Sequence, residues 1–401
     1  MWNRVSQRAQ ARNIFPMRAS QEHQNPLDSQ INDLHLEHIP KSGDMKMFET
    51  FGFETLTPRS ASVLFGLSLG LGFGVLAFLS RFCLRRGLVG PASERHSALT
   101  TWLMALAVAV IGTQAAAWAG WISFSEHRFL APDLPLVEIL LGGVMFGAGM
   151  VLTRGCLSRL TVLAATGNLR AVVVLGVAAL TALATLKGAI APLRLILEDI
   201  TVAAPTLPAW FAIAPVVAVA VMLARHRPSL GQLTLGALIG ALVPLAWVGT
   251  GLVLQDEFDP ITFESLAFTA PWADSLFWTV AASAVSGNFG TGLIGGVLTG
   301  ALLTALLTRQ FAWQGFETAS QMGQYLIGGA LMGVGGVFAG GCTVGAGMSG
   351  LSTLSLAAVA ALGSIVLGAL ATDRLLARRL NPQSNGGSVA PSTTPATPPA
   401  A

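Results

Sequence analysis

Two glycine-rich stretches decide the fold of this chain: GGVMFGAGMVLTRGC, residues 142–156, and GGALMGVGGVFAGGC, residues 328–342. They align without a gap at an offset of 186 residues, and seven positions are identical, mostly glycines and the final cysteine. The same offset carries the apolar run at 98–122 onto 284–308 and the run at 169–188 onto 355–374. The chain therefore contains an internal repeat.

The composition around the repeat is that of a membrane protein. Of the 401 residues, 53% are hydrophobic and 11% are charged, whereas soluble domains are about a quarter charged. No Asp, Glu, Lys or Arg occurs between Thr318 and Thr372. The net charge is only +3, and no basic cluster lies beside aromatic residues, so we expect no nucleic-acid partner.

Nine apolar runs are long enough to cross the roughly 30 Å hydrocarbon core of a bilayer. They lie at 61–80, 98–122, 136–153, 169–188, 207–224, 231–254, 289–308, 324–340 and 350–371. Three shorter apolar segments, at 157–166, 189–197 and 272–285, are expected to be re-entrant or interfacial. The predicted fold class is an all-α polytopic membrane protein with about nine transmembrane helices plus short re-entrant helices.

The runs read as four spans, one linking span and four further spans. An odd linker makes the second repeat enter the membrane upside down, so we predict two inverted repeats. The predicted domains are a polar N-terminal extension (1–59), a first membrane repeat (60–190), a linker with one span (191–228), a second repeat (229–373) and a disordered tail (380–401). The extension lacks the apolar segment of a signal peptide. It is expected to be disordered, or to precede the true start at Met45 or Met47.

Basic residues predict the orientation. Most arginines near the membrane, including Arg85, Arg159 and Arg374, lie on one side of nine alternating spans, whereas few basic residues lie on the other. By the positive-inside rule, the arginine-rich side is cytoplasmic. The N-terminus is then outside, the C-terminus is cytoplasmic, and the acidic loop at 255–274 is outside.

The chain has three cysteines, and each stands beside a polar or glycine-rich break in an apolar run. Irregular backbone within a membrane is tolerated only where it packs against protein or lines a cavity. A buried cysteine is commonly a small apolar packing residue, but the breaks and the repeat favour a functional role. The predicted substrate-binding and transport residues are Cys83, Cys156, Cys342, Gly155, Gly341 and Arg154.

A thiol at the mouth of a broken helix offers two chemistries. A neutral S–H is a weak donor that suits a soft sulfur anion, and the amides of the following short helix help to neutralise the anion's charge. A thiolate, favoured by nearby arginines, is instead a nucleophile toward sulfane sulfur. For an anion that passes through, the neutral donor is preferable, because a thiolate would repel it.

Three stretches, residues 72–87 (GFGVLAFLSRFCLRRG), 147–170 and 328–356, resemble the YeeE/YedE family of sulfur-transport membrane proteins. The resemblance covers about residues 64–371. It implies uptake of thiosulfate or a related small sulfur-containing anion, through an hourglass-like protein of the bacterial inner membrane, with the three cysteines contacting the anion. It also implies a small cytoplasmic sulfur-carrier protein as a partner. Characterised members carry a further cysteine in the second half, where residues 281–290 of this chain offer only Ser283, Ser286 and Asn288.

Other functional classes lack their signatures. The sequence has no nucleotide-binding fingerprint, paired-carboxylate site, nucleophile–base set or metal-ligand spacing, so we predict neither an enzyme nor a cofactor. The alternatives are a membrane-embedded thiol sulfurtransferase, for which no soluble catalytic domain is present, and a selenium-compound transporter. Besides the anion, the predicted partner is membrane lipid.

Overall fold

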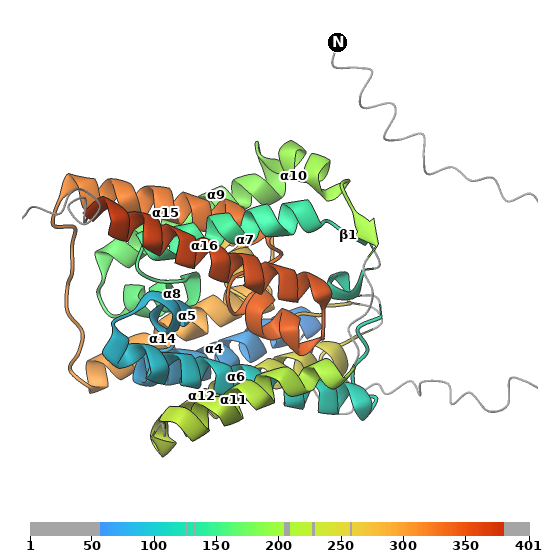
Figure 1. Cartoon of the computed structure of the whole chain (residues 1–401). Helices are drawn as coiled ribbons and strands as arrows, with labels where there is room; N and C mark the ends of the chain where they lie inside the picture. The colour runs from blue at the N-terminus through green and yellow to red at the C-terminus, as the bar shows by residue number, and fades with distance from the viewer. Residues whose placement is uncertain are drawn as a thin grey trace, which may run out of the picture. The chain divides into compact units, whose positions relative to one another are not determined.

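The computed structural model describes residues 57–125, 127–131, 133–203, 209–226, 229–256 and 259–380 (Figure 1). All of these residues belong to one compact unit, Met47–Ala401. The predicted tails, 1–59 and 380–401, lie outside the described residues except at 57–59 and 380. The described part is mostly helical. Its only sheet pairs two short antiparallel strands, β1 (Asp133–Leu134) and β2 (Val202–Ala203), which confirms the predicted all-α class.

Each of the nine apolar runs overlaps one α-helix. These helices are α4 (Pro58–Ser80), α6 (Ala92–Trp118), α7 (Leu136–Leu152), α9 (Leu169–Lys187), α11 (Ile213–His226), α12 (Leu230–Val248), α14 (Phe289–Leu307), α15 (Ala319–Phe338) and α16 (Leu356–Leu380). Seven segments of the described chain are long and apolar enough to cross a membrane. Helix α11 has only 14 residues, and α15 begins with the polar Ser320, Gln321 and Gln324, so neither is among the seven. The chain is therefore a multi-pass membrane protein, and the count of nine stays a prediction.

Short helices occupy the breaks. They are α5 (Leu84–Val89), α8 (Leu157–Ala165), α10 (Ala191–Glu198) and α13 (Thr269–Ala281), with single helical turns η2 (Arg128–Leu130), η3 (Ala209–Ala212), η4 (Gly249–Val253) and η5 (Gly345–Gly350). The three short apolar segments predicted from sequence correspond to α8, α10 and α13. Helix α8 is half buried in the core, whereas no residue of α10 is buried.

Helices α4 and α14 pack with their backbones almost in contact. Each carries glycines at every fourth position, and a Cβ atom added at any of them would meet the backbone of the other helix. The glycines are Gly66, Gly70 and Gly74 on α4, and Gly292, Gly296 and Gly300 on α14. This small-xxx-small pattern allows close van der Waals packing where lipid offers no hydrophobic drive for association.

Each repeat packs its glycine-rich helix against a helix of the other repeat. The offset carries α7 onto α15 and α9 onto the first part of α16; correspondingly, α7 packs against α16 and α15 packs against α9. Helices α7 and α15 also pack against each other (Figure 1). Gly142 lies against Ala339, and Gly328 lies against Thr153, which are the same pair of positions in the two repeats. As the contacts advance along α7 from Gly142 to Thr153, their partners on α15 go back from Ala339 to Gly328, so α7 and α15 are antiparallel.

Candidate functional site

The three cysteines follow three helix endings of the same form. Helices α4, α7 and α15 each end in a residue with left-handed backbone, and the cysteine comes two residues later. The left-handed residues are Arg81 (φ 52°), Arg154 (φ 58°) and Gly340 (φ 72°). In each case the amide of that residue donates to the carbonyl three residues earlier, which closes the last turn of the helix. A short helix, α5, α8 or η5, then begins at or just after the cysteine.

Each cysteine sulfur faces the amide of the residue three positions ahead. For Cys342, the amide of Gly345 donates to Sγ at 3.4 Å. The amides of Arg86 and Arg159 point in the same way toward the sulfurs of Cys83 and Cys156, although they do not complete a capping hydrogen bond. Backbone N–H groups at the start of these short helices are therefore directed at the thiols, and such groups favour the binding of an anion there.

The structure brings the three predicted cysteines together. All three are free and buried, with at most 4% of their surface exposed. The thiols of Cys83 and Cys156 interact directly, and Cys156 also interacts with Thr343, the residue after Cys342. Cys156 Sγ lies 3.3 Å from Ser158 Oγ. Cys342 lies within electrostatic range of Cys156. We call Cys83, Cys156 and Cys342 the thiol cluster.

The positive charge beside the thiol cluster belongs to Arg159. Its guanidinium interacts electrostatically with both Cys83 and Cys156. The side chain of Arg154, the arginine predicted from sequence, is exposed at the end of α7. A pattern in the sequence could have pointed to Arg159, because Cys83–Arg86 and Cys156–Arg159 share a Cys-x-x-Arg spacing.

The two predicted glycines lie directly before cysteines. Gly155 is buried between the left-handed Arg154 and Cys156. Gly341 has a φ of 156°, and a Cβ atom there would lie only 2.7 Å from the amide nitrogen of Ala346. Glycine at 341 is therefore required for the chain to turn from α15 into η5 at this close distance.

A polar pocket of about 310 Å³ opens beside the loop that carries Cys342. It is lined by Gly340, Gly341 and Thr269, and by a charged group of side chains: Arg128, Asp133, Glu138, Arg194 and Glu198. The guanidinium of Arg194 lies 3.9 Å from Glu138 and 3.1 Å from Glu198. That of Arg128 donates to the carbonyl of Gly340 at 3.4 Å. The pocket thus combines two guanidinium groups and three carboxyl groups with the backbone that leads into Cys342.

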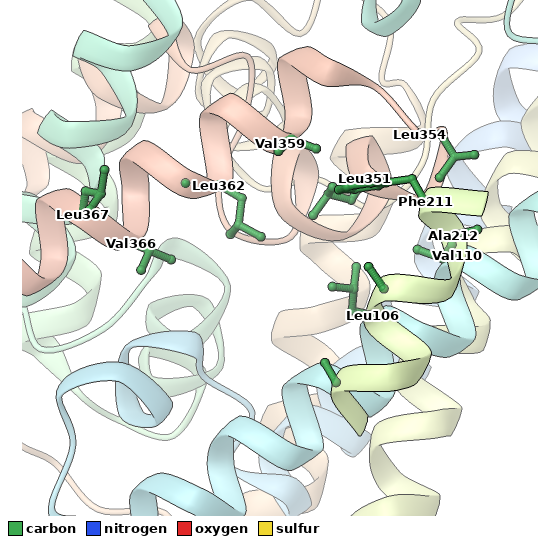
Figure 2. A pocket seen from close by; sticks show the side chains of 13 residues that line it. Leu106, Val110, Phe211, Ala212, Leu351, Leu354, Val359, Leu362, Val366 and Leu367 are labelled. Atoms are coloured by element: carbon green, nitrogen blue, oxygen red, sulfur yellow. The ribbon is translucent and has the colours of Figure 1, made fainter. Parts of the chain in front are cut away.

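A second pocket, of about 580 Å³, has a different character. It lies between α6, α11, α16 and the end of η5, and Figure 2 shows its apolar lining, which includes Leu106, Phe211 and Leu362. No cysteine or charged side chain lines it. It therefore offers an anion no compensating charge or donor.

The polar residues considered as substitutes for a further cysteine have other roles. Ser283 is exposed. Ser286 Oγ accepts a hydrogen bond from Arg59 at 3.0 Å. Asn288 Oδ1 accepts from the amide of Thr291 at 2.9 Å and caps α14. None of the three lines the polar pocket.

Buried thiols at the ends of broken helices, in a chain with several apolar spans, are typical of membrane transport proteins. Comparison with known proteins agrees. The sequence model of the sulphur transport family matches residues 79–230 and 224–371, so the chain belongs to this family. The chain is also 25% identical over 320 residues to "Thiosulfate transporter TsuA" of Escherichia coli (strain K12), covering 71% of this chain and 86% of that protein. The resemblance seen in the sequence is confirmed, and the protein is a transporter and not an enzyme.

Proposed function

We propose that this protein takes up thiosulfate, or a related small sulfur-containing anion, across the bacterial inner membrane by way of the thiol cluster. The observation that carries the proposal is the convergence of Cys83, Cys156 and Cys342 beside the guanidinium of Arg159. The relative from Escherichia coli supports the choice of thiosulfate, since it is named a transporter of that anion.

The proposed pathway runs between two inverted repeats. The antiparallel contact of α7 with α15, and the exchange of their partners α9 and α16, support a pseudo-two-fold relation between the repeats. Helices α7 and α15 then enter from opposite sides of the membrane, and each ends in a turn that returns toward the centre. The polar pocket is the outer entrance in this scheme, and the end of α7 with its arginines faces the cytoplasm.

The thiols act in this scheme as neutral S–H donors. Thiosulfate has a soft terminal sulfur and three hard oxygens, so a polarisable S–H contacts the sulfur end without the repulsion that a thiolate would cause. Amides such as that of Gly345, together with the guanidinium of Arg159, offset the charge of the partly desolvated anion. A small cytoplasmic sulfur-carrier protein is the acceptor we propose on the inner side.

One observation favours a second mechanism. The proximity of Arg159 to two thiols also stabilises a thiolate, which would accept sulfane sulfur as a persulfide. The thiolate of Cys83 or Cys156 would attack the outer sulfur of thiosulfate, which forms a cysteine persulfide, breaks the S–S bond of thiosulfate and releases sulfite, so the substrate would not pass intact. Cysteine variants separate the two mechanisms, as argued below.

The test of function is growth of an uptake-deficient bacterial host that expresses this chain. Thiosulfate, sulfide and polysulfide are supplied one at a time as the sole sulfur source, and uptake of labelled selenium analogues is measured in parallel. We expect growth on thiosulfate that requires the expressed protein. Normal insertion in the membrane without growth or uptake on any compound would contradict the proposal.

A further inference from the structure

The sequence offset that relates the two repeats places Thr269 at the position of Cys83. The difference between 83 and 269 is 186, the same as between Cys156 and Cys342. A phenylalanine precedes each residue, and the rings of Phe82 and Phe268 lie 6.2 and 5.2 Å from that of Phe73. A short helix begins at this point in both halves, α5 after Cys83 and α13 at Thr269.

The side chain of Thr269 is buried without a partner. It is 3% exposed, and its hydroxyl has no hydrogen bond within the described residues. It lines the polar pocket and contacts the region of Gly336 on α15. A hydroxyl that is desolvated and unpaired destabilises a fold unless a ligand or water completes it.

Thr269 also adjoins the thiol cluster. The residue before it, Phe268, directs its amide at the sulfur of Cys342. In the first half, Cys83 interacts directly with Cys156, the repeat equivalent of Cys342. Thr269 therefore occupies the sequence position equivalent to Cys83 and lies next to the residue whose amide faces Cys342, on the side of the polar pocket, but its own hydroxyl has no hydrogen-bond partner in the part of the chain that the structure describes. Of the unpaired buried groups in the described part, it alone lines that pocket.

We propose that Thr269 is the fourth ligand of the transport pathway, whose hydroxyl donates to an oxygen of a sulfur oxyanion between the polar pocket and Cys342. The inference rests on the proposed transport function and adds to it a residue that determines specificity. A hydroxyl is a harder and stronger donor than a thiol, so it selects oxygen atoms. This position then favours thiosulfate over anions without oxygen, such as hydrosulfide.

The test compares Thr269→Val, which keeps the shape and removes the donor, with Thr269→Ser, which keeps the donor. Ser283→Ala is the matched control on an exposed hydroxyl. Initial rates of labelled thiosulfate uptake are measured against concentration and normalised to protein in the membrane. We expect the half-saturation concentration to rise about tenfold or more in Thr269→Val, and to change less than about twofold in the other two. Wild-type affinity in Thr269→Val would overturn the inference, whereas absence of uptake in the wild type would overturn the proposed function.

A second measurement does not depend on turnover. In Thr269→Cys, a small charged thiol reagent is applied with and without thiosulfate, and labelling of the peptide that contains residue 269 is read by mass spectrometry. We expect labelling that thiosulfate suppresses. A cysteine at 269 that resists the reagent, or that thiosulfate does not protect, would contradict the assignment even if Thr269→Val inserts poorly.

Discussion

Arg154 and Gly340 occupy equivalent positions in the two repeats, and both have left-handed backbone, with φ of 58° and 72°. Each stands two residues before a cysteine of the thiol cluster. Left-handed backbone costs a residue with a Cβ atom roughly 1 kcal/mol or more, and glycine adopts it freely. Because glycine stands at the equivalent position 340, this backbone conformation does not need the Arg154 side chain, which is exposed.

We therefore expect substitutions of Arg154 and Arg159, the two arginines near Cys156, to have different effects. We expect Arg154→Gly to retain uptake and to stabilise the protein slightly, by roughly 0.5–1 kcal/mol, because it removes left-handed strain. We expect Arg159→Gln to lower uptake about tenfold to a hundredfold, because the guanidinium that faces both thiols is lost. Uptake rates and melting temperatures of the two variants check this. Loss of uptake in Arg154→Gly alone would return that side chain to the pathway.

Hydropathy was sufficient to locate the helices. A helix that crosses a bilayer needs an uninterrupted apolar run, so all nine runs overlap helices in the structure. The repeat also predicted that Cys156 and Cys342 follow equivalent helices. Hydropathy alone does not determine the number of spans, because the glutamines at the start of α15 lower its mean hydropathy and α15 is not among the seven candidate spans.

The composition of the site was only partly predictable. The Cys-x-x-Arg spacing predicts the position of Arg159, because the side chain of the third helical residue can reach back toward the N-cap residue. No such pattern points to Thr269, because the sequence around it shares little with that around Cys83 beyond the preceding phenylalanine. Its burial and its unpaired hydroxyl depend on how α13 packs against α15, which no local pattern encodes.

The close packing of α4 and α14 predicts a sharp difference between two glycines on one helix. A Cβ atom at Gly70 would collide with the backbone of Leu293, whereas one at Gly72 has only a Leu242 methyl group at 3.9 Å. We expect Gly70→Ala to lower the melting temperature and the yield in membranes. Gly72→Ala should be neutral or slightly stabilising, because alanine favours helix. Equal stability of the two variants would show that the helices are not this close.

The carboxyl of Glu264 predicts a pH dependence of stability. Burial, and then the charge of Asp274, raise its pKa to about 7, against a smaller opposing effect of Arg128. The folded state therefore binds a proton that the unfolded state releases at lower pH, so this contribution to stability is present below about pH 4.5 and is lost as pH rises through 7. His127 acts in the opposite sense, because burial and Arg128 lower its pKa to about 4.

A difference measurement isolates Glu264 from His127. We expect Glu264→Gln to melt above the wild type at pH 8, by roughly 2–4 °C, because the variant never carries the buried charge. The advantage should vanish near pH 5, where the wild-type carboxyl is protonated. Thermal unfolding of the purified protein in detergent at both pH values checks this. An advantage of the same size at both would exclude titration as its cause.

The arginine asymmetry predicts the orientation. Reporter domains fused after Gln383 and inserted at Asp259 should report opposite compartments, the first cytoplasmic and the second outside, if the spans alternate as predicted. At each position, the activity of one reporter that works only in the cytoplasm is compared with that of a second reporter that works only outside it. The same compartment for both would require a different span count between the two points.

The mechanism of the thiols decides how serine behaves in their place. If they are neutral donors, alanine at Cys156 or at Cys342 removes a contact that a partly desolvated anion cannot replace with water. Such a contact is worth roughly 1.5–3 kcal/mol, so uptake should fall about tenfold to a hundredfold. Serine keeps a donor of smaller size, and should retain part of the activity.

If Cys83 or Cys156 is instead a nucleophile, serine there should be as inactive as alanine, and a persulfide should accumulate on the cysteine of the wild-type protein during turnover. Uptake kinetics of the alanine and serine variants, with mass spectrometry of the trapped thiols, distinguish these outcomes. Full uptake by both Cys156→Ala and Cys342→Ala would contradict either mechanism and leave the cysteines as packing residues of a buried core.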